Sequence, residues 1–554
     1  MTDTENAKRQ RISIWSSVGQ IIPDISLSLD QLIGRIPQTE RATLPGDMED
    51  AYGSEFNDVD PPSGLNLIRL PHGLLRSAGL GLVNGPDTLL YIRPRCLTQI
   101  VFMCRDVMEH GFVGHIFGQP GAGKSSTALF VATRLAKEKK CSVLWAHLNV
   151  GKPDNAWQCI CMRPDGTMST CAGLTDRQMA RLLKKFGRSE DESSKLHVVM
   201  LDGIKFDGDT SEVPARSWFL ANQSKRRLIL ISSDGADMGL SGRQRAEDEI
   251  RIFRQWSWDF NSYKNAISIP EFWDHVESVL DSPEAPDLPE NLSETEKRLW
   301  NKYYFSGGCA RWMFKYSTKL VQADIDGAIS KRLKSGDVDT NVISRLFSRF
   351  KPKKVQIVSE YARQKMLESM GTVALKALQH HPIITQCDNG AQGQLFEFFV
   401  YFEALERSKR REAIILRNRG GPDKAIVFES VVRKHIPILH RSDCPRMTLI
   451  WPYSAYQPAF DGFYIDDSGD VIVFLQVTLG EKHKVNLLKL RQTMEQLELN
   501  KCEFHFIIPT YMMAQFKVGT IINPKELSQY GWPVDERSIT AHIKVFGIDG
   551  WDST

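Results

Sequence analysis

Residues 118–125 read GQPGAGKS and match the phosphate-binding pattern G-x-x-x-x-G-K-S, directly after an apolar run and at the start of a helical one. Glycines at these positions let backbone N–H groups wrap around phosphates, and the start of the helix favours their charge. Lys124 can reach the β- and γ-phosphates, and the Ser125 hydroxyl can ligate Mg²⁺. The motif predicts a nucleoside triphosphate site. Its candidate residues are Gly118, Gly121, Gly123, Lys124, Ser125 and Ser126.

A site of this kind also needs an acid at the end of an apolar strand. The run HVVMLDG, residues 197–203, supplies Asp202, which can hold Mg²⁺ through its water shell. Many P-loop ATPases carry a glutamate after this aspartate to orient the attacking water, whereas this chain has Gly203. We therefore expect either that another residue acts as the base or that hydrolysis is slow.

Two other elements could sense the γ-phosphate. The strand RRLILISS ends in Ser232 and Ser233, where related folds place a polar sensor residue. Arg311 follows Gly307 and Gly308, and this arrangement resembles the GGxxR element of signal-transduction ATPases with an appended helical domain. The sequence leaves open whether Arg311 contacts the γ-phosphate or is an ordinary surface arginine. The sequence also leaves open whether the nucleobase is adenine or guanine, so the expected cofactors are ATP or GTP with Mg²⁺.

A second group of polar residues lies nearer the carboxyl terminus. Asp461 begins a predicted strand, Gln476 and Thr478 end its hairpin partner on one face, and Glu397 lies on an upstream helix. This layout is typical of restriction-endonuclease-like nucleases, in which the acids bind a divalent metal that activates water against a phosphodiester. The alternative is a half-buried hairpin with incidental polar residues.

The second group departs from the usual Asp/Glu-x-Lys pattern. Gln476 replaces the acid and Thr478 the lysine, and an amide oxygen is a weaker metal ligand than a carboxylate. Lys482 or His483 could supply the missing positive or proton-transferring group. The candidate catalytic residues are Glu397, Asp461, Gln476, Thr478 and His483. The candidate metal ligands are Ser125, Asp202, Glu397, Asp461 and Gln476.

The elements that position these residues indicate an α/β fold. Short apolar runs alternate with helical periodicity around the phosphate-binding motif, which predicts a parallel sheet. We expect a P-loop NTPase domain with a helical extension, followed by a restriction-endonuclease-like α/β domain. The predicted divisions are an amino-terminal arm with an acidic linker (1–85), the P-loop NTPase domain (86–268), a helical subdomain (269–335), a basic linker (336–369) and the nuclease domain (370–554).

Composition agrees with several folded domains. The chain has 554 residues, 42% of them hydrophobic and 25% charged, as in globular proteins. A net charge of +3 neither favours nor excludes nucleic acid as a partner. The segment 331–365 is locally basic, with ten Lys/Arg against three acids, and is either a solvated linker face or a phosphate-contacting surface.

Other sequence features exclude several classes of protein. The ten cysteines are scattered, and Cys159, Cys161 and Cys171 lack the paired spacing of a zinc site, so we expect reduced thiols. The amino terminus shows no apolar core of a signal peptide, and no run approaches the roughly 18 apolar residues of a membrane span. We therefore expect no membrane partner. The basic cluster at residues 8–11 could act as a nuclear address.

Taken together, the motifs resemble a known family. A P-loop module followed by GxxFE (393–397), FDGF (460–463) and LQVTxxxxH (475–483) is similar to the Crinkler effectors of oomycetes and fungi and to the related retrotransposon hot spot proteins of trypanosomes. The stretch LLYIRP at 89–94 resembles the YxR segment that these families carry before the P-loop. The likeness covers roughly residues 89–509.

The resemblance implies a chain in which NTP binding regulates or powers a DNA-directed nuclease that acts in a nucleus. In Crinklers this is the nucleus of a host cell, where the protein triggers cell death or alters defence. By this resemblance the nuclease centre comprises Glu397, Asp461, Gln476, Thr478 and His483. The NTPase centre comprises residues 118–125 with Asp202 and Arg311.

We therefore expect an NTPase-coupled, magnesium-dependent nuclease that contacts DNA through the basic segment and the second α/β domain. The first alternative is a nucleotide-switched module whose inactive nuclease-like domain binds DNA or protein without cutting. The second is an ATP-dependent assembly factor that self-associates through its P-loop domain.

Overall fold

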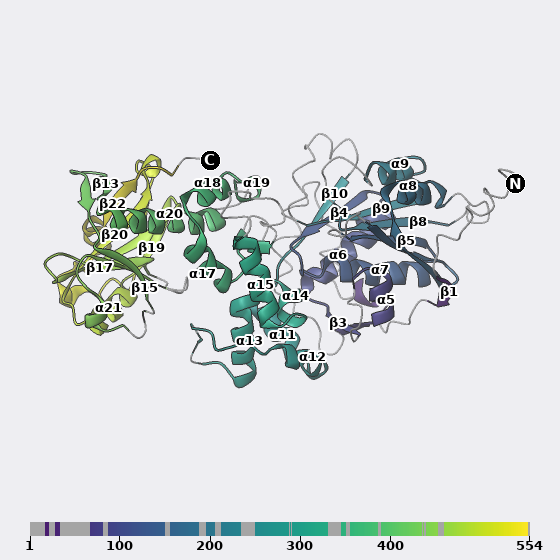
Figure 1. The fold of residues 1–554 in the computed structure, drawn as a ribbon, viewed down its shortest axis with the longest axis horizontal. Coiled ribbons are helices and arrows are strands. Elements are labelled where there is room, and N and C mark those ends of the chain that lie inside the picture. The colour runs from purple at the N-terminus through teal and green to yellow at the C-terminus, as the bar shows by residue number, and fades with distance from the viewer. Residues whose placement is uncertain are drawn as a thin grey trace. The chain divides into compact units, whose positions relative to one another are not determined.

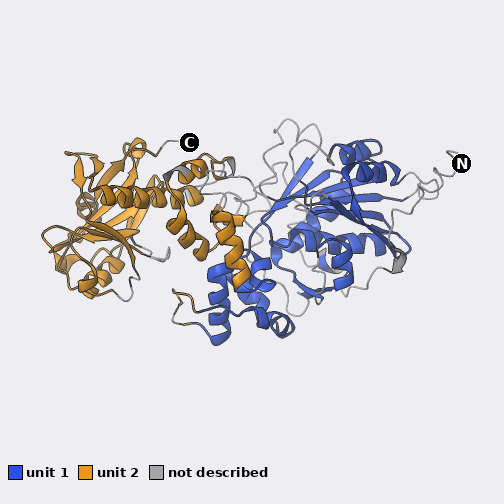
Figure 2. Ribbon diagram, in the orientation of Figure 1, with its two compact units in different colours: residues 1–283, 292–318, 348–352 blue, residues 284–291, 319–347, 353–554 orange. Residues whose placement is uncertain are grey.

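The computed structural model of the chain describes residues 17–21, 28–33, 67–80, 87–149, 156–187, 195–204, 212–233, 250–286, 288–289, 291–330, 345–350, 355–385, 389–434, 436, 439–452 and 459–551. Most of the amino-terminal arm with the acidic linker (1–85), the basic cluster at 8–11 and just over half of the basic segment 331–365 lie outside these residues. The chain divides into two compact units (Figure 2), which are described separately below.

The first unit is built on an eight-stranded sheet in the order β1-β7-β6-β5-β8-β9-β4-β10 (Figure 1). The five strands from β5 to β10 are parallel, while β6, β7 and β1 extend the sheet in antiparallel pairs. The strands are β1 (Ser17–Ile21), β4 (Val113–Gly118), β5 (Ser142–Asn149), β6 (Ala156–Met162), β7 (Thr167–Leu174), β8 (His197–Asp202), β9 (Arg226–Ile231) and β10 (Ile250–Gln255). The predicted mixed α/β fold with a parallel sheet is thus confirmed for this unit.

Helices cover both faces of this sheet because the central parallel strands are apolar throughout and must be buried on each side. One hydrophobic cluster fills the space under α6 (Pro94–Phe102), the π-helix η1 (Met103–Glu109) and α7 (Lys124–Lys137). A second cluster lies under α8 (Asp176–Lys185) and α9 (Glu212–Leu220). The phosphate-binding loop joins β4, a fully buried strand, to α7.

The position of β4 in the sheet marks the place for a ligand. Its neighbours are β9 on one side and β10 on the other. The chain leaves β4 toward β5, on the β9 side, whereas the connection that follows β9 crosses to β10 on the opposite side. In open α/β sheets ligands bind outside the carboxyl ends of the strands at such a switch point. The phosphate-binding loop and Asp202 both lie at the carboxyl ends of their strands.

The predicted helical region of this unit has its own aromatic core. Trp258, Tyr263, Phe272 and Phe314 gather around Tyr91 of the small hairpin that precedes α6. The elements are β2 (Leu67–Leu70), α5 (His72–Ser77), β3 (Thr88–Tyr91), α11 (Phe260–Ile267), α12 (Pro270–Val276), η4 (Glu277–Val279), α13 (Glu294–Ser306) and α14 (Ala310–Phe314), with α2 (Leu29–Ile33) earlier in the chain. This core places α14 next to the phosphate-binding loop, as shown below.

The second unit contains another eight-stranded sheet, in the order β14-β13-β22-β20-β18-β17-β16-β15 (orange in Figure 2). Its centre is an antiparallel meander of β16, β17 and β18, followed by a crossover through α21 to β20, which is parallel to β18. The strands are β13 (Ile414–Asn418), β14 (Lys424–Ile426), β15 (Ser430–Lys434), β16 (Thr448–Pro452), β17 (Gly462–Ile465), β18 (Val471–Val477), β20 (Lys501–Pro509) and β22 (Lys544–Ile548).

Helices and a short parallel ribbon complete the second unit. They are α15 (Thr318–Ala328), α17 (Glu360–Ser369), α18 (Thr372–Gln379), α19 (Pro382–Thr385), α20 (Asn389–Arg410), α21 (Leu487–Gln496), α22 (Glu536–His542), the 3₁₀ turns η7 (Arg441–Asp443), η8 (Thr510–Met512) and η9 (Ser528–Tyr530), the strand β12 (Val355–Ile357), and the ribbon β19 (Lys482–Asn486) with β21 (Lys517–Ile522). The strand β11 (Phe347–Arg349) lies in the chain at a division between the two units. No described helix is both long and apolar enough to span a bilayer.

Sequence periodicity placed the main elements to within a few residues. The helical run expected after the phosphate-binding motif is α7, and the upstream helix expected to carry Glu397 is α20. Asp461 lies one residue before β17, although its N–H still donates to the carbonyl of Leu475 in the ladder.

Arg93, in the YIR segment, ties the back of the phosphate-binding loop to the strand beside it. Its side chain is 5% exposed and donates to the carbonyls of Ala122, Ser257 and Trp256, at 3.0 Å for the first two. Its guanidinium also lies 5.1 Å from the centre of the Trp258 ring. Backbone carbonyls do not neutralise the charge of Arg93. Its role is to hold the loop against the end of β10 through these hydrogen bonds.

We predict that Arg93→Met destabilises the protein by about 3 kcal/mol, because three buried carbonyls lose a charged donor. Thermal unfolding followed by calorimetry measures the change. Arg69→Met is the matched control, since Arg69 makes only exposed pairs with Glu271 and Asp87 and should cost under about 1 kcal/mol. Equal losses in the two variants would contradict the structural role of Arg93.

Candidate functional site

The phosphate-binding loop can be built only from glycine at two of its positions. Gly118, Gly121 and Gly123 all have positive φ, at 152°, 80° and 100°. A Cβ at Gly118 would lie 2.2 Å from the carbonyl oxygen of Gln255, and one at Gly121 would lie 2.5 Å from Cys309 Sγ. The loop therefore runs directly against β10 and the start of α14, with no room for side chains.

Lys124 lies inside this loop. Its Nζ donates to the carbonyl oxygens of Gly118 at 2.6 Å and Gln119 at 2.9 Å, and the side chain is buried. The carbonyl of Lys124 in turn accepts from Gln99 Nε2 at 2.9 Å, which anchors the start of α7 to α6. The ammonium is thus held at the centre of the loop, where phosphate oxygens would meet it. Ser126 follows in the first turn of α7.

Asp202 is shared between two partners. Its Oδ1 accepts from Ser125 Oγ at 2.9 Å, and its Oδ2 lies 2.7 Å from His147 Nδ1. The sequence predicted the pairing of Ser125 with Asp202 but not His147, whose only signal was a polar residue near the end of the apolar strand β5. His147 and Asp202 are register partners on the parallel strands β5 and β8.

The donor set around Ser125 suits Mg²⁺. A hydroxyl and a carboxylate beside a phosphate-binding loop are hard oxygen ligands, which together with phosphate oxygens are what Mg²⁺ prefers. Ser125 and Asp202 would hold the ion, which would neutralise charge on the phosphates. Among the described residues no cluster of three or more His, Cys, Asp or Glu side chains could hold a metal by itself, so phosphates and waters would complete the shell.

Gly203 departs from the expected glutamate for a conformational reason. Its φ is +81°, and a Cβ there would lie 3.0 Å from the carbonyl oxygen of Leu148. A side chain at this position would therefore strain the backbone as well as crowd β5. The absence of the acid is a consequence of how the chain turns after β8.

Arg311 lies at the phosphate-binding loop. A Cβ on Gly121 would approach Arg311 N to 3.1 Å and Arg311 Cβ to 3.2 Å, and the Arg311 side chain itself is exposed. No carboxylate pairs with Arg311 among the described residues. The candidate sensor Ser232 is different: it is buried, and its hydroxyl lies 3.0 Å from His115 Nε2. Of these two, only Arg311 is exposed beside the loop.

In the second unit three carboxylates surround one guanidinium. Arg363 of α17, only 4% exposed, lies 3.2 Å from Glu397 Oε2 and 3.4 Å from Glu360 Oε1. Asp461 is close enough for its charge to interact with both Arg363 and Glu397. Sequence reasoning found Glu397 and Asp461 but missed Arg363 and Glu360, which lie on a helix that carries no motif.

Burial raises the pKa of the Glu397 and Asp461 carboxyls, and the neighbouring Glu397 raises that of Asp461 further. Arg363 acts in the opposite direction on both, and Asp461 Oδ2 also accepts from Val477 N at 2.7 Å. Ionising both carboxyls in this setting is unfavourable, and a cation beside Glu397 and Asp461 would make it less so.

The other predicted residues of this site differ in whether they contact Asp461. Gln476 donates through Nε2 to Asp461 Oδ2 at 2.5 Å, so its amide nitrogen faces the acid. The Thr478 hydroxyl accepts from Gly480 N at 3.0 Å and caps the local turn. The ring of His483 lies 5.8 Å from that of Phe506, the register partner of Gln476. Asp461, Gln476 and Glu397 are thus gathered, and Thr478 is engaged elsewhere.

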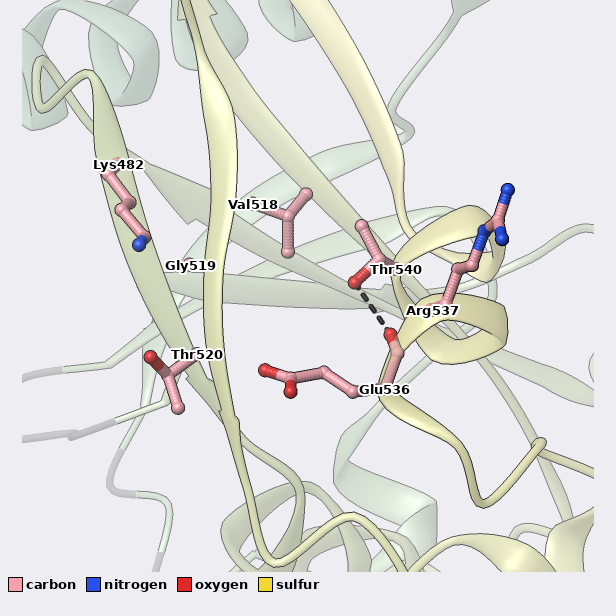
Figure 3. A pocket seen from close by; sticks show the side chains of 7 residues that line it. All are labelled: Lys482, Val518, Gly519, Thr520, Glu536, Arg537 and Thr540. Carbon is pink, nitrogen blue, oxygen red and sulfur yellow. Dashed lines mark hydrogen bonds between the residues drawn. The ribbon is translucent and has the colours of Figure 1, made fainter.

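Lys482, the other cation expected near the site, lines a separate pocket of about 490 Å³ on β19, β21 and α22 (Figure 3). Thr520, Glu536, Arg537 and Thr540 line it as well. None of the candidate catalytic residues lies in its wall. The pocket therefore belongs to the second unit's surface rather than to the acidic cluster.

No protein-family model matches the chain, and comparison with curated proteins gives no match. Among solved structures, the chain is similar to the Thermotoga maritima RuvB Holliday junction branch migration motor, with 15% identity, a TM-score of 0.25, and coverage of 46% of this chain and 87% of that one. It is also similar to Cdc6p from Pyrobaculum aerophilum, with 10% identity, a TM-score of 0.23, and coverage of 55% and 77%.

A third similar structure is Drosophila ORC bound to poly(dA/dT) DNA and Cdc6, with 12% identity, a TM-score of 0.23, and coverage of 60% of this chain and 52% of that one. Similarities of this size carry no argument about activity. The P-loop architecture of the first unit instead follows from its own geometry. The loop joins β4 to α7, Lys124 lies inside it, and the Ser125 hydroxyl donates a hydrogen bond to Asp202.

We predict that Arg363→Met destabilises the protein by about 3–5 kcal/mol, because it leaves buried carboxylates without their cation. Denaturant unfolding measures the loss. Arg417→Met is the control: Arg417 also meets two carboxylates, Asp423 and Asp549, but all three side chains are exposed and the change should stay under about 1 kcal/mol. A small effect of both substitutions would mean that the cluster is open to water.

We also predict that Asp461→Asn becomes more stable relative to the wild type as the pH rises from about 5 to about 8. The folded-state pKa of Asp461 is raised, so its contribution is complete below the unfolded pKa of about 4 and is lost as the pH rises through the folded pKa. Unfolding free energies at several pH values measure this difference. Asp467→Asn, an exposed carboxylate in the same hairpin, should show no such trend. A pH-independent loss in Asp461→Asn would contradict the prediction.

Proposed function

We propose that this protein is a P-loop NTPase that binds and hydrolyses a nucleoside triphosphate with Mg²⁺, and that this reaction regulates a metal-dependent DNA nuclease in the second unit. The observation that carries the first half is the convergence of Lys124, Ser125 and Asp202 at the carboxyl ends of β4 and β8. The resemblance to Crinklers and retrotransposon hot spot proteins carries the second half.

In the proposed reaction each residue has a separate task. Backbone N–H groups of the loop and Lys124 bind the phosphates, and Ser125 and Asp202 hold Mg²⁺. Arg311, exposed beside Gly121 and without a carboxylate partner among the described residues, approaches the γ-phosphate. Because α14 touches the loop directly, loss of the γ-phosphate would alter the position of α14. The nucleotide would be ATP or GTP.

The nuclease half is supported by two neighbouring carboxyls, Glu397 and Asp461, whose pKa burial raises. A divalent cation bound by both would favour their ionised forms. The antiparallel meander with a parallel fourth strand places Asp461 just before its second strand and Gln476 near the end of its third. DNA would be the substrate. The protein would act in a nucleus, which would be that of a host cell if the protein is an effector.

The alternative function is a nucleotide-switched module that binds DNA or protein without cutting. Two observations favour it: Arg363 already pairs with Glu397, and the amide nitrogen of Gln476, not a carboxylate, faces Asp461. Neither arrangement is what a site with three metal ligands would need. Self-association through the P-loop unit is compatible with both functions, and a nucleotide-dependent change in molecular mass would support it.

We predict that Lys124→Ala weakens nucleotide binding by about 10–100-fold, as expected for loss of a charged hydrogen-bond donor to phosphate. Fluorescent-nucleotide titration measures the affinity. Lys184→Ala, an exposed lysine on α8, is the control and should bind as the wild type does. Unchanged binding in Lys124→Ala would refute the nucleotide site.

We predict further that purified protein with Mg²⁺ or Mn²⁺ nicks supercoiled plasmid, and that Asp461→Ala abolishes this cutting. Lys124→Ala should lose the part of the activity that depends on nucleotide, while Asp467→Ala should cut normally. If no protein cuts under any metal while the wild type hydrolyses ATP, the nuclease half is wrong and the binding module becomes the function.

A further inference from the structure

The geometry after β8 raises the question of what orients the attacking water. Hydrolysis at a P-loop needs a group that holds water in line with the γ-phosphorus. The usual glutamate is missing, and Gly203 could not be replaced by one without strain, because its φ is +81° and Leu148 O is 3.0 Å from the place of a Cβ. Among the described residues, the neighbouring strands offer other groups for this task.

Two strands flank β8 at this edge, and at the register of Asp202 the β9 residue is the apolar Ile231 while the β5 residue is the polar His147. On the β9 side, Ser232 is buried and bonded to His115. On the β5 side, His147 is the register partner of Asp202, and its side chain is 19% exposed. His147 is thus beside the carboxylate that would hold Mg²⁺ and is open to water.

The contact with Asp202 defines how the imidazole can act. Nδ1 lies 2.7 Å from Oδ2, and an ionised carboxylate only accepts, so Nδ1 carries the proton of the neutral ring. Nε2 then has a free lone pair and can accept a hydrogen bond. No described residue donates to Nε2. The ring is therefore oriented by Asp202 with its acceptor atom available to water.

One glycine makes the room for this ring, and a second lies beside it. A Cβ at Gly79 would lie 2.7 Å from His147 Cδ2, so only glycine fits beside that edge. A Cβ at Gly203 would lie 3.7 Å from Cε1, in van der Waals contact. The imidazole therefore lies against the point from which a glutamate side chain at position 203 would extend.

We propose that His147 is the water-positioning residue of the NTPase, in the place of the missing glutamate; this inference rests on the proposed hydrolysis of a nucleoside triphosphate. Nε2 accepts a hydrogen bond from the water. The water oxygen forms a bond to the γ-phosphorus, and the bond from that phosphorus to the bridging oxygen breaks with its electron pair leaving on the nucleoside diphosphate. Both protons of the water remain on the released phosphate as dihydrogen phosphate. His147 orients the water and keeps no proton.

The test separates binding from turnover in the full-length protein. His147→Ala should lower kcat by about 100-fold while the dissociation constant of the fluorescent triphosphate changes by less than about threefold. His147→Gln retains an acceptor on a side chain of similar reach and should recover about tenfold over His147→Ala. His110→Ala, which removes an exposed histidine at the end of η1, is the control and should hydrolyse as the wild type does.

The outcomes distinguish failure of the role of His147 from failure of the proposed NTPase function. If the wild type binds no nucleotide, both fail. If the wild type hydrolyses and His147→Ala keeps its kcat, the role of His147 fails alone. If both His147 variants lose nucleotide affinity as much as turnover, or lower the thermal midpoint by more than the control does, His147 only supports the fold and the inference is overturned. Loss of kcat with intact binding, partly recovered by glutamine, supports it.

Discussion

The close contact between the phosphate-binding loop and the elements behind it is the constraint on which the first unit depends. Side chains are excluded at Gly118 by the carbonyl of Gln255 and at Gly121 by Cys309 and the backbone of Arg311. Arg93 and Gln99 then hold the loop by hydrogen bonds to its own carbonyls. A loop fixed in this way cannot change shape without moving β10 or α14, and this gives the phosphate site a steric connection to the helical segment.

The same edge of the sheet contains a buried carboxylate with two partners. Asp202 accepts from Ser125 of α7 and from His147 of β5, so one side chain joins the loop, the helix that follows it and a neighbouring strand. Low polarity around such a group strengthens its hydrogen bonds and makes each of them specific. The left-handed turn at Gly203 belongs to this arrangement, since it leaves the space beside β8 to an imidazole.

The second unit shows a different physical situation. In the part of the chain that the structure describes, Arg363 lies beside Glu397 and Glu360, and burial raises the pKa of the Glu397 and Asp461 carboxyls. Groups held in an unfavourable protonation equilibrium cluster at functional sites. Two such carboxyls beside a buried guanidinium are the reason to regard the cluster as a candidate site for a cation or for chemistry.

Much of this protein is determined locally and could be predicted from sequence. The P-loop requires glycines and Lys124 at a fixed short spacing. The strand and helix periods predicted β4, α7, β8, α20 and the β17–β18 hairpin, because each of these elements depends on residues a few positions apart. The sequence also predicted that Asp202 and Ser125 would share a site. The contacts that the sequence could not predict form where strands and helices from distant parts of the chain meet. His147 pairs with Asp202 across 55 residues, and Arg363 with Glu397 across 34. No local pattern encodes such pairs, because burial and register bring them together only when the sheets form.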